Sequence, residues 1–310
     1  MKLPMKFMAL GLSVASLLFV ACAKTSTSGT GGTTSPSATG STTVTKDATI
    51  AAEVPAAIAS KGSLIIGADA SYPPMEFFPP GSNTMAGVDV DLGHAIGDVL
   101  GIKFNFVNAT FATIIPGLGN GRYDLGMSSF TDDEGSATTK QRLKVVDFVT
   151  YFSAGTGFYE KPGGPNVTGL DNSLCGLTIG VESGTTQESD ATAQSTKCVA
   201  AGKSKVSVLS YPDQDKANLA LSSGRVQVVM ADSETCTYAV SKSNGGFASV
   251  GPVYGSAPYG VAVPKRYTSL DQAILDAIKK LMSNGVYGQI LAKWGVTGSG
   301  INNPVIHTGK

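Results

Sequence analysis

An excess of charge of either sign is missing from this 310-residue chain. Lys and Arg together number 23, Asp and Glu together also number 23, and charged residues make up only 15% of the sequence. No run of Lys or Arg is present that could meet a phosphate backbone. We therefore expect no nucleic-acid partner.

Histidine and closely spaced cysteine are scarce as well. The two histidines, His94 and His307, lie far apart, and no CxxC pair occurs. The ligand spacing of a zinc site is absent, and we expect neither a metal ion nor a cofactor. After the first 21 residues no apolar run is long enough to cross a bilayer.

The N-terminus carries an export signal. Lys2 and Lys6 precede an apolar run of about 15 residues that ends at Ala21, which is typical of a secretory signal and too short for a spanning helix. Cys22 follows at once, so residues 17–22 resemble a bacterial lipobox. The resemblance implies that residues 1–21 are removed as a signal peptide and that Cys22 becomes a diacylglyceryl-bearing N-terminus. The alternative is an ordinary signal peptide with an accidental cysteine.

A low-complexity segment follows the lipobox. Residues 22–49 consist almost entirely of Thr, Ser, Gly, Ala and Pro after Cys22. Such a composition has too few apolar side chains to offset the entropy of ordering, so it predicts a flexible tether. A flexible coil of this length spans roughly 30 Å. The sequence therefore indicates an extracytoplasmic domain that is anchored to the cell membrane by lipid.

Three cysteines remain in the rest of the chain. Disulfides persist outside the cytoplasm, and three thiols allow one bridge and one free cysteine. Cys175 precedes an expected strand, and Cys198 lies near the end of the helix-like stretch that follows it. We expect these two to be bonded. Cys236 is expected to be a small buried hydrophobe, and a bridge to it is the alternative.

About 260 residues after the tether suffice for one large domain or two lobes. Short apolar segments alternate with segments of helical periodicity, which favours an α/β fold with largely parallel sheets. Strands are predicted at 64–67, 103–107, 124–128, 177–181, 206–210 and 226–230. Helices are predicted at 88–100, 112–119, 186–201, 213–223, 269–283 and 286–294. In such sheets ligands bind at the carboxyl ends of strands.

The loops at those strand ends resemble a known family. The marks are Gly67-Ala68-Asp69-Ala70-Ser71-Tyr72-Pro73-Pro74-Met75-Glu76-Phe77, Gly87-Val88-Asp89-Val90-Asp91-Leu92, Val146-Asp147-Phe148, Gly184-Thr185-Thr186 and Lys293-Trp294-Gly295. Over residues 62–297 the chain resembles the extracytoplasmic solute-binding proteins of ABC transporters, family 3, in the branch that binds polar amino acids.

The resemblance implies an α/β, two-lobed periplasmic-binding-protein fold of type II. Two crossover strands near 151–154 and 253–257 would join lobe 1 (62–152 plus 257–297) to lobe 2 (155–254), with residues 298–310 as a tail. It also implies a monomer that captures a polar or charged amino acid between its lobes and delivers it to permease subunits in the membrane.

The resemblance assigns the ligand's carboxylate to Arg142, which lies six residues before Phe148, as the family's arginine does. A guanidinium suits this role because it pairs bidentately with a carboxylate. Ser128, Ser129 and Thr131 match hydroxyl positions that bond the ligand's α-groups. The family spaces the last hydroxyl and the arginine about five residues apart, so residues 133–138 look like an insertion.

The remaining contacts come from other loops. Thr186 and Gln187 open a helix whose N–H groups attract an anion, although a plain N-cap is a competing interpretation. Asp232 matches the acid that takes the ligand's ammonium. Tyr72 and Phe111 match aromatic positions around the ligand side chain. Asp69, with Glu182 nearby, suggests a basic or polar ligand.

Two other functions remain open. A few proteins with this fold are dehydratases of cyclic acids, and that chemistry needs a general acid or base. No histidine falls in the predicted cleft, so the candidates would be Asp69, Glu76, Glu182 and Asp232. A ligand-sensing domain is the other alternative. We expect a transport receptor and not an enzyme.

Overall fold

The computed structural model describes residues 44–267 and 269–309. Within them, the main sheet has the strand order β4-β1-β5-β10-β6-β9-β7-β8, and β11 pairs with β6. Its strands are β1 (Ser63–Ala68), β4 (Lys103–Asn108), β5 (Leu125–Gly126), β6 (Val146–Glu160), β7 (Thr178–Glu182), β8 (Ser207–Tyr211), β9 (Val228–Asp232), β10 (Ala248–Pro264) and β11 (Ile306–His307). A separate antiparallel pair is formed by β2 (Ser71–Tyr72) and β3 (Glu76–Phe77).

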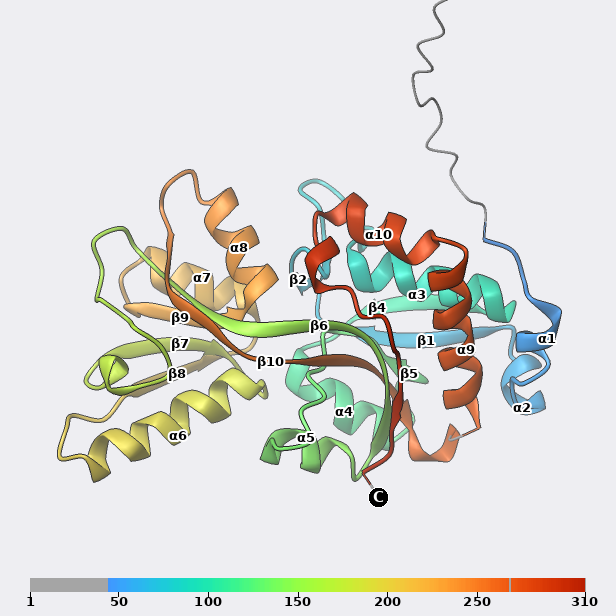
Figure 1. Ribbon diagram of the computed structural model, residues 1–310, viewed down its shortest axis with the longest axis horizontal. Helices are drawn as coiled ribbons and strands as arrows, with labels where there is room; N and C mark the ends of the chain where they lie inside the picture. The colour runs from blue at the N-terminus through green and yellow to red at the C-terminus, as the bar shows by residue number, and fades with distance from the viewer. Residues whose placement is uncertain (1–43, 268, 310) are drawn as a thin grey trace, which may run out of the picture. The chain divides into compact units, whose positions relative to one another are not determined.

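Helices cover both sides of this sheet (Figure 1). In the first lobe they are α1 (Ala48–Ala51), α2 (Ala56–Ala59), α3 (Val88–Leu100), α4 (Phe111–Gly119), α5 (Ala137–Arg142), α9 (Leu270–Ser283) and α10 (Val286–Trp294). In the second they are α6 (Thr186–Ala200), α7 (Gln214–Ser222) and α8 (Ser233–Lys242). Short 3-10 helices span Asn172–Leu174, Lys265–Tyr267 and Thr297–Ser299.

Two long antiparallel strands join the lobes. β6 and β10 have 15 and 17 residues and run through the middle of the sheet (Figure 1). β1 and β5 are parallel neighbours on one side, and β7 and β9 are parallel neighbours on the other. The register of the long pair shifts between Val250 and Tyr254 and again between Tyr254 and Ala257. The α/β class and the two crossover strands expected from the sequence are confirmed, whereas the stated lobe limits stay a prediction.

Helix ends follow local sequence signals. α3 carries Asp89 and Asp91 in its first turn, where acids favour the helix dipole, and ends at Gly101 in the left-handed conformation. In α6 the Thr185 side chain accepts from the Glu188 N–H, which caps the helix. The apolar face of α9 is buried against the first lobe, as its periodicity predicts.

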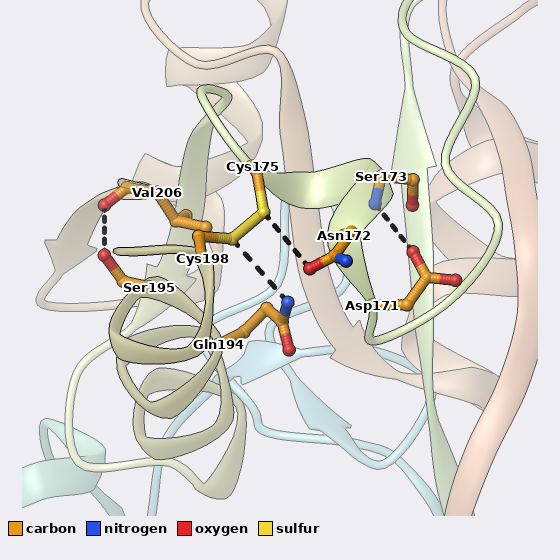
Figure 2. The surroundings of a disulfide bond; sticks show 8 residues. All are labelled: Asp171, Asn172, Ser173, Cys175, Gln194, Ser195, Cys198 and Val206. Carbon is orange, nitrogen blue, oxygen red and sulfur yellow. Dashed lines mark hydrogen bonds between the residues drawn. A yellow bond between two sulfur atoms is a disulfide. The ribbon is translucent and has the colours of Figure 1, made fainter. Parts of the chain in front are cut away.

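The disulfide expected between Cys175 and Cys198 is confirmed (Figure 2), with the two Cα atoms 5.6 Å apart. It ties the segment before β7 to the end of α6. Cys236 is free and buried on α8, as expected. Its thiol bonds the carbonyl oxygen of Ala231.

The predicted tether, residues 22–49, extends too far toward the C-terminus. Residues 44–49 belong to the folded part, because Asp47 caps α1, its N–H donates to the Val99 carbonyl, and Ile50 is buried in the core. Asp47 also pairs with Lys280 on α9. The signal peptide, Cys22 and the rest of the tether lie outside the described residues. In the described part of the chain, no helix is long and apolar enough to span a bilayer.

Candidate functional site

A cavity lies where the strand ends of the two lobes meet. All the space in it that protein atoms leave unfilled, including space open to solvent, amounts to about 280 Å³. All ten side chains predicted as ligand contacts line it, and Glu76, Glu182 and Thr185 line it too. The ten are Asp69, Tyr72, Phe111, Ser128, Ser129, Thr131 and Arg142 from the first lobe, and Thr186, Gln187 and Asp232 from the second.

Two buried carboxyl groups come from the first lobe. Asp69 follows β1 and accepts hydrogen bonds from the N–H groups of Ser71 (3.1 Å) and Phe111 (2.9 Å). Glu76 accepts from the hydroxyl groups of Ser128 (2.7 Å) and Ser129 (3.3 Å). Burial raises the pKa of both groups, and that of Glu76 lies well above its ordinary value because Asp89 is also close.

Two more carboxyl groups end strands of the second lobe. Asp232, the last residue of β9, accepts from the Tyr72 hydroxyl (2.9 Å) and the Gln187 amide (2.8 Å). Glu182, the last residue of β7, is 2% exposed, and its Oε1 has no hydrogen-bond partner among the described residues. Burial raises the pKa of Asp232 to about 6. Burial and then the nearby Asp69 raise that of Glu182 well above its usual range.

Arg142 is the cation of the cavity lining. Its Nη1 donates to the Thr131 carbonyl (3.2 Å), and its Nη2 donates to the Gly184 carbonyl of the second lobe (2.9 Å). The guanidinium also lies 5.2 Å from the centre of the Phe111 ring. Burial lowers the pKa of Arg142 to about 10, so the group stays charged at neutral pH.

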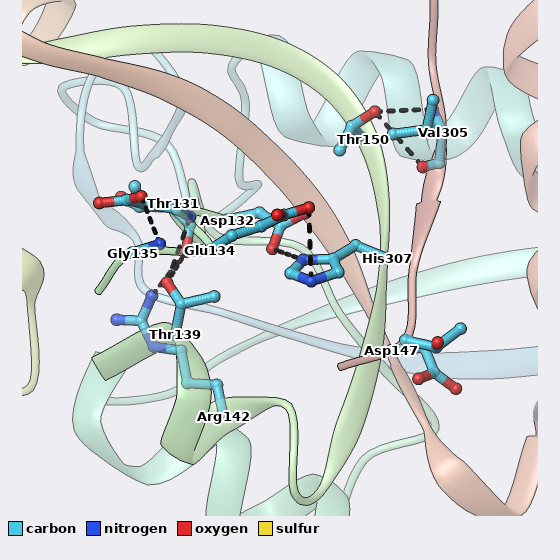
Figure 3. Close-up of polar contacts among 12 residues, drawn as sticks. Thr131, Asp132, Glu134, Gly135, Thr139, Arg142, Asp147, Thr150, Val305 and His307 are labelled. Atoms are coloured by element: carbon cyan, nitrogen blue, oxygen red, sulfur yellow. Dashed lines mark hydrogen bonds and ion pairs between the residues drawn. The ribbon is translucent and has the colours of Figure 1, made fainter. Parts of the chain in front are cut away.

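The possible insertion at 133–138 does not remove Arg142 from the cavity. Residues 133–136 form a turn, and α5 then begins at Ala137. Thr131 and Arg142 are 11 residues apart in sequence, yet the backbone of one contacts the side chain of the other (Figure 3). The extra residues form the turn and the start of α5, and they do not separate the Thr131 backbone from the Arg142 side chain.

The other predicted residues frame the same space. Phe111 stacks on Phe130, with ring centres 4.9 Å apart, so one of its faces is covered by protein. Thr186 begins α6, and its hydroxyl donates to the Gln187 side chain (3.3 Å). The structure brings all ten together, but their roles as ligand contacts stay predictions.

Sequence reasoning left three lining residues out of the ligand set. Glu76 lies within the Tyr-Pro-Pro-Met-Glu stretch, and Glu182 and Thr185 lie at the end of β7 and the start of α6. Their positions at strand ends were the available signal. With Glu76 and Glu182 included, four carboxyl groups and one guanidinium line the same cavity.

This arrangement offers a guanidinium to an anionic group and several carboxyl groups to hydrogen-bond donors or cations. Burial favours the neutral form of these acids in the protein without ligand, and a cation beside them would favour the ionised form. Residues 44–267 and 269–309 contain no group of three or more His, Cys, Asp or Glu side chains placed to hold a metal ion.

Comparisons with known proteins show the family to which the chain belongs. Residues 64–297 match the model of the bacterial extracellular solute-binding proteins, family 3. The arginine-binding protein of Corynebacterium glutamicum is 34% identical over 80% of this chain and 79% of its own length. The glutamine-binding protein of an ABC transporter of Bacillus subtilis is 30% identical over 69% of this chain and 74% of its own.

A solved structure resembles the fold as well. An ancestral arginine-binding protein bound to arginine superposes with a TM-score of 0.66 and is 31% identical. The match covers 75% of this chain and 98% of the other. The two-lobed architecture of amino-acid-binding proteins is thereby confirmed.

The buried acids predict how the stability of the protein without ligand depends on pH. Asp232 and Asp89 have a pKa of about 6 in the folded protein, above the ordinary value of 3.8. Because the folded protein binds these two protons more tightly than the unfolded chain does, protonation stabilises the fold. This stabilisation is complete below the ordinary pKa of 3.8 and is lost as the pH rises through about 6. We expect a higher melting temperature at pH 5 than at pH 8, measured by calorimetry. The difference should be roughly 2–4 °C for each kcal/mol of unfolding free energy that is lost between the two pH values.

Asp232→Asn should shrink this difference, and Asp98→Asn on the exposed side of α3 should leave it unchanged. Greater stability at pH 8 than at pH 5 would mean that these acids are ionised and paired in the fold.

Proposed function

Because this chain belongs to the bacterial extracellular solute-binding proteins, family 3, and so binds an amino acid for an ABC transporter, we propose that its ligand is a cationic amino acid such as arginine. The observation that carries the proposal is the unpartnered Oε1 of buried Glu182 beside Asp69. A guanidinium or ammonium at the end of a ligand side chain would pair with both acids.

The charge balance supports this choice. The ligand's carboxylate would pair with Arg142, and its α-ammonium would pair with Asp232. With a neutral side chain the two acids Asp69 and Glu182 would keep the neutral forms that burial favours, so their ionised forms would have no partner in the site. A cationic side chain instead brings forked donors to two carboxyl groups, as the planar guanidinium allows.

The contacts around the α-groups come from both lobes. Arg142, Ser129 and Thr131 belong to the first lobe, and the N-terminus of α6 and Asp232 belong to the second. An amino acid between them bridges the lobes, so its binding favours the closed form over the open form. Tyr72 and Phe111 would flank the aliphatic part of the side chain.

The relatives are named for a cationic ligand in some cases and for a neutral one in others. One is named for arginine and one for glutamine, and the ancestral protein was solved with arginine. A shared site for the α-groups with a separate subsite for the side chain accounts for such a range. In this chain the acids of that subsite favour the cationic member.

We further propose that the protein acts as a lipid-anchored monomer outside the cytoplasm and performs no chemistry on its ligand. The family is extracellular. The anchor rests on the lipobox-like residues that end at Cys22, and two acyl chains hold a protein on a membrane stably where one is marginal. The cavity acids serve as charge partners in this proposal, not as general acids or bases.

Calorimetric titration of the purified protein tests the ligand. Arginine and lysine should bind at least tenfold more tightly than glutamine, and glutamate should not bind measurably. Arg142→Ala and Arg142→Lys should each weaken arginine binding by two orders of magnitude or more. An unpaired buried ligand charge costs about 2–5 kcal/mol, and an ammonium cannot form the fork.

Arg122→Ala, at an exposed position of the same lobe, is the control and should bind normally. Arginine should be recovered unchanged after long incubation. Consumption of an amino acid or a cyclic acid with saturable kinetics would instead support the dehydratase-like alternative.

Glu182→Gln tests the side-chain subsite. It removes a negative charge but keeps the shape, so arginine affinity should fall about tenfold or more while glutamine affinity changes by less than threefold. Glu53→Gln, an exposed acid at the far end of the first lobe, should change neither. Equal losses for the two ligands would place Glu182 outside the side-chain subsite.

Cys22→Ser tests the anchor. The wild-type protein should partition into detergent with a mass that shows acylated Cys22 as its first residue, and the variant should be released in folded form. A mature wild-type chain that starts elsewhere and carries no lipid would refute the anchor without affecting the ligand proposal.

A further inference from the structure

The C-terminal residues run along one of the two strands that join the lobes. β11 pairs with β6 through Ile306 and His307, and the N–H of Thr150 on β6 donates to the Val305 carbonyl (2.9 Å). The Val305 N–H in turn donates to the Thr150 hydroxyl (2.8 Å; Figure 3). Residues 298–310, expected as a simple tail, are thus packed on the fold as far as the structure describes them.

His307 extends from this strand to the loop that precedes Arg142. Its Nδ1 lies 2.6 Å from Asp132 Oδ1, a distance at which an Nδ1–H donates to the carboxylate (Figure 3). The Asp132 side chain is only 3% exposed, and that of His307 is 18% exposed. Glu134 is 3.7 Å from the other ring nitrogen, but its side chain is 81% exposed. The buried contact is therefore the one between His307 and Asp132.

Asp132 is directly connected to the support of Arg142. Its own N–H donates to the Pro258 carbonyl on β10 (2.7 Å). The residue before it, Thr131, forms a bridge with Tyr259, and its carbonyl accepts from Arg142 Nη1 (3.2 Å) and from the Thr139 hydroxyl (3.2 Å). A displacement of Asp132 would move the carbonyl on which the guanidinium rests.

Segment 131–139, which is this loop together with the start of α5, also reaches the second lobe. The Thr138 and Ser189 hydroxyl oxygens are 2.8 Å apart, and Ser189 lies on α6. The loop therefore contributes to the junction of the lobes through Thr138 and to the cavity through Thr131. Its position affects both the cavity lining and the contact between the lobes.

We propose that His307 is a positioning residue for Arg142: by pairing with buried Asp132 it holds the 131–139 loop where the Thr131 carbonyl supports the guanidinium. The inference rests on the proposed role of Arg142 as the contact for the ligand's carboxylate. Without His307, the Asp132 carboxylate is left buried beside Asp133 and Glu134. Such a group turns toward water and carries its backbone with it.

The test compares two substitutions at one position. His307→Ala removes the partner of Asp132, whereas His307→Asn keeps a side-chain N–H near the place of Nδ1. Titration with arginine should show a dissociation constant about tenfold higher for the alanine variant, which corresponds to about 1.4 kcal/mol, and within about twofold of wild type for the asparagine variant.

Two further variants separate positioning from a general effect of the tail. Val305→Ala alters an exposed side chain of the same segment (45% exposed) and leaves its backbone hydrogen bonds, so it should bind as wild type does. In an Asp132→Asn background, His307→Ala should cause much less than its tenfold loss, because no buried charge is left unpaired.

Hydrogen exchange of the 131–142 backbone in protein without ligand gives a readout that does not depend on binding. Exchange should be faster in His307→Ala and unchanged in His307→Asn and Val305→Ala. If the wild type binds no amino acid, the proposed function fails and this measurement still decides the role of His307. Wild-type affinity and exchange in His307→Ala, or an asparagine variant as impaired as the alanine variant, would overturn the inference.

Discussion

Four buried carboxyl groups and one guanidinium line the cavity at the junction of the two lobes, and the hydrogen bonds that accommodate them constrain this junction. Asp69 and Glu76 are accommodated by N–H and hydroxyl donors of their own lobe, and Asp232 is bonded by Tyr72 and Gln187. Glu182 keeps an oxygen without a partner. Neutral hydrogen-bond donors accommodate a buried acid in its neutral form, and a cation favours its ionised form. The proposed preference for a cationic ligand depends on this difference.

β6 and β10 determine how these groups meet, because they are continuous through both lobes. Asp232 ends β9, which pairs with β6, and Thr131 forms a bridge to Tyr259 on β10. The regular register of the long pair is interrupted around Tyr254, and Gly255 has a φ of +62°, which glycine adopts without strain. A bend at this irregular stretch would move Asp232 relative to Arg142 while each lobe keeps its own packing.

Local patterns predicted the elements that have strong periodicity or clear ends, such as Val88–Leu100 with its acidic first turn and terminal glycine. The cavity residues were predicted from the resemblance to a family, since Arg142, for example, ends α5 and no local pattern marks it as part of a site. β5 extends only over Leu125–Gly126, shorter than its apolar run suggested. α1 was hidden in a stretch with the composition of a tether, and tertiary contacts of Ile50 fix it. The contact between His307 and Asp132 joins residues 175 apart, for which neither composition nor spacing gives a signal.

Some hydrogen bonds join the two lobes without a ligand between them. They reduce the free energy that a ligand has to contribute to closure. Tyr72 bonds Asp232, and the Gln214 N–H donates to the Ser71 hydroxyl (3.0 Å). Such bonds favour the closed form whichever amino acid is present, and they raise the population that is competent to hold a ligand tightly. They do not distinguish one ligand side chain from another, because a ligand shifts an equilibrium only by its differential affinity for the two forms. In the proposed binding mode, selectivity among amino acids therefore arises where the ligand side chain ends, at Asp69 and Glu182, and the α-group contacts supply affinity that all candidates share.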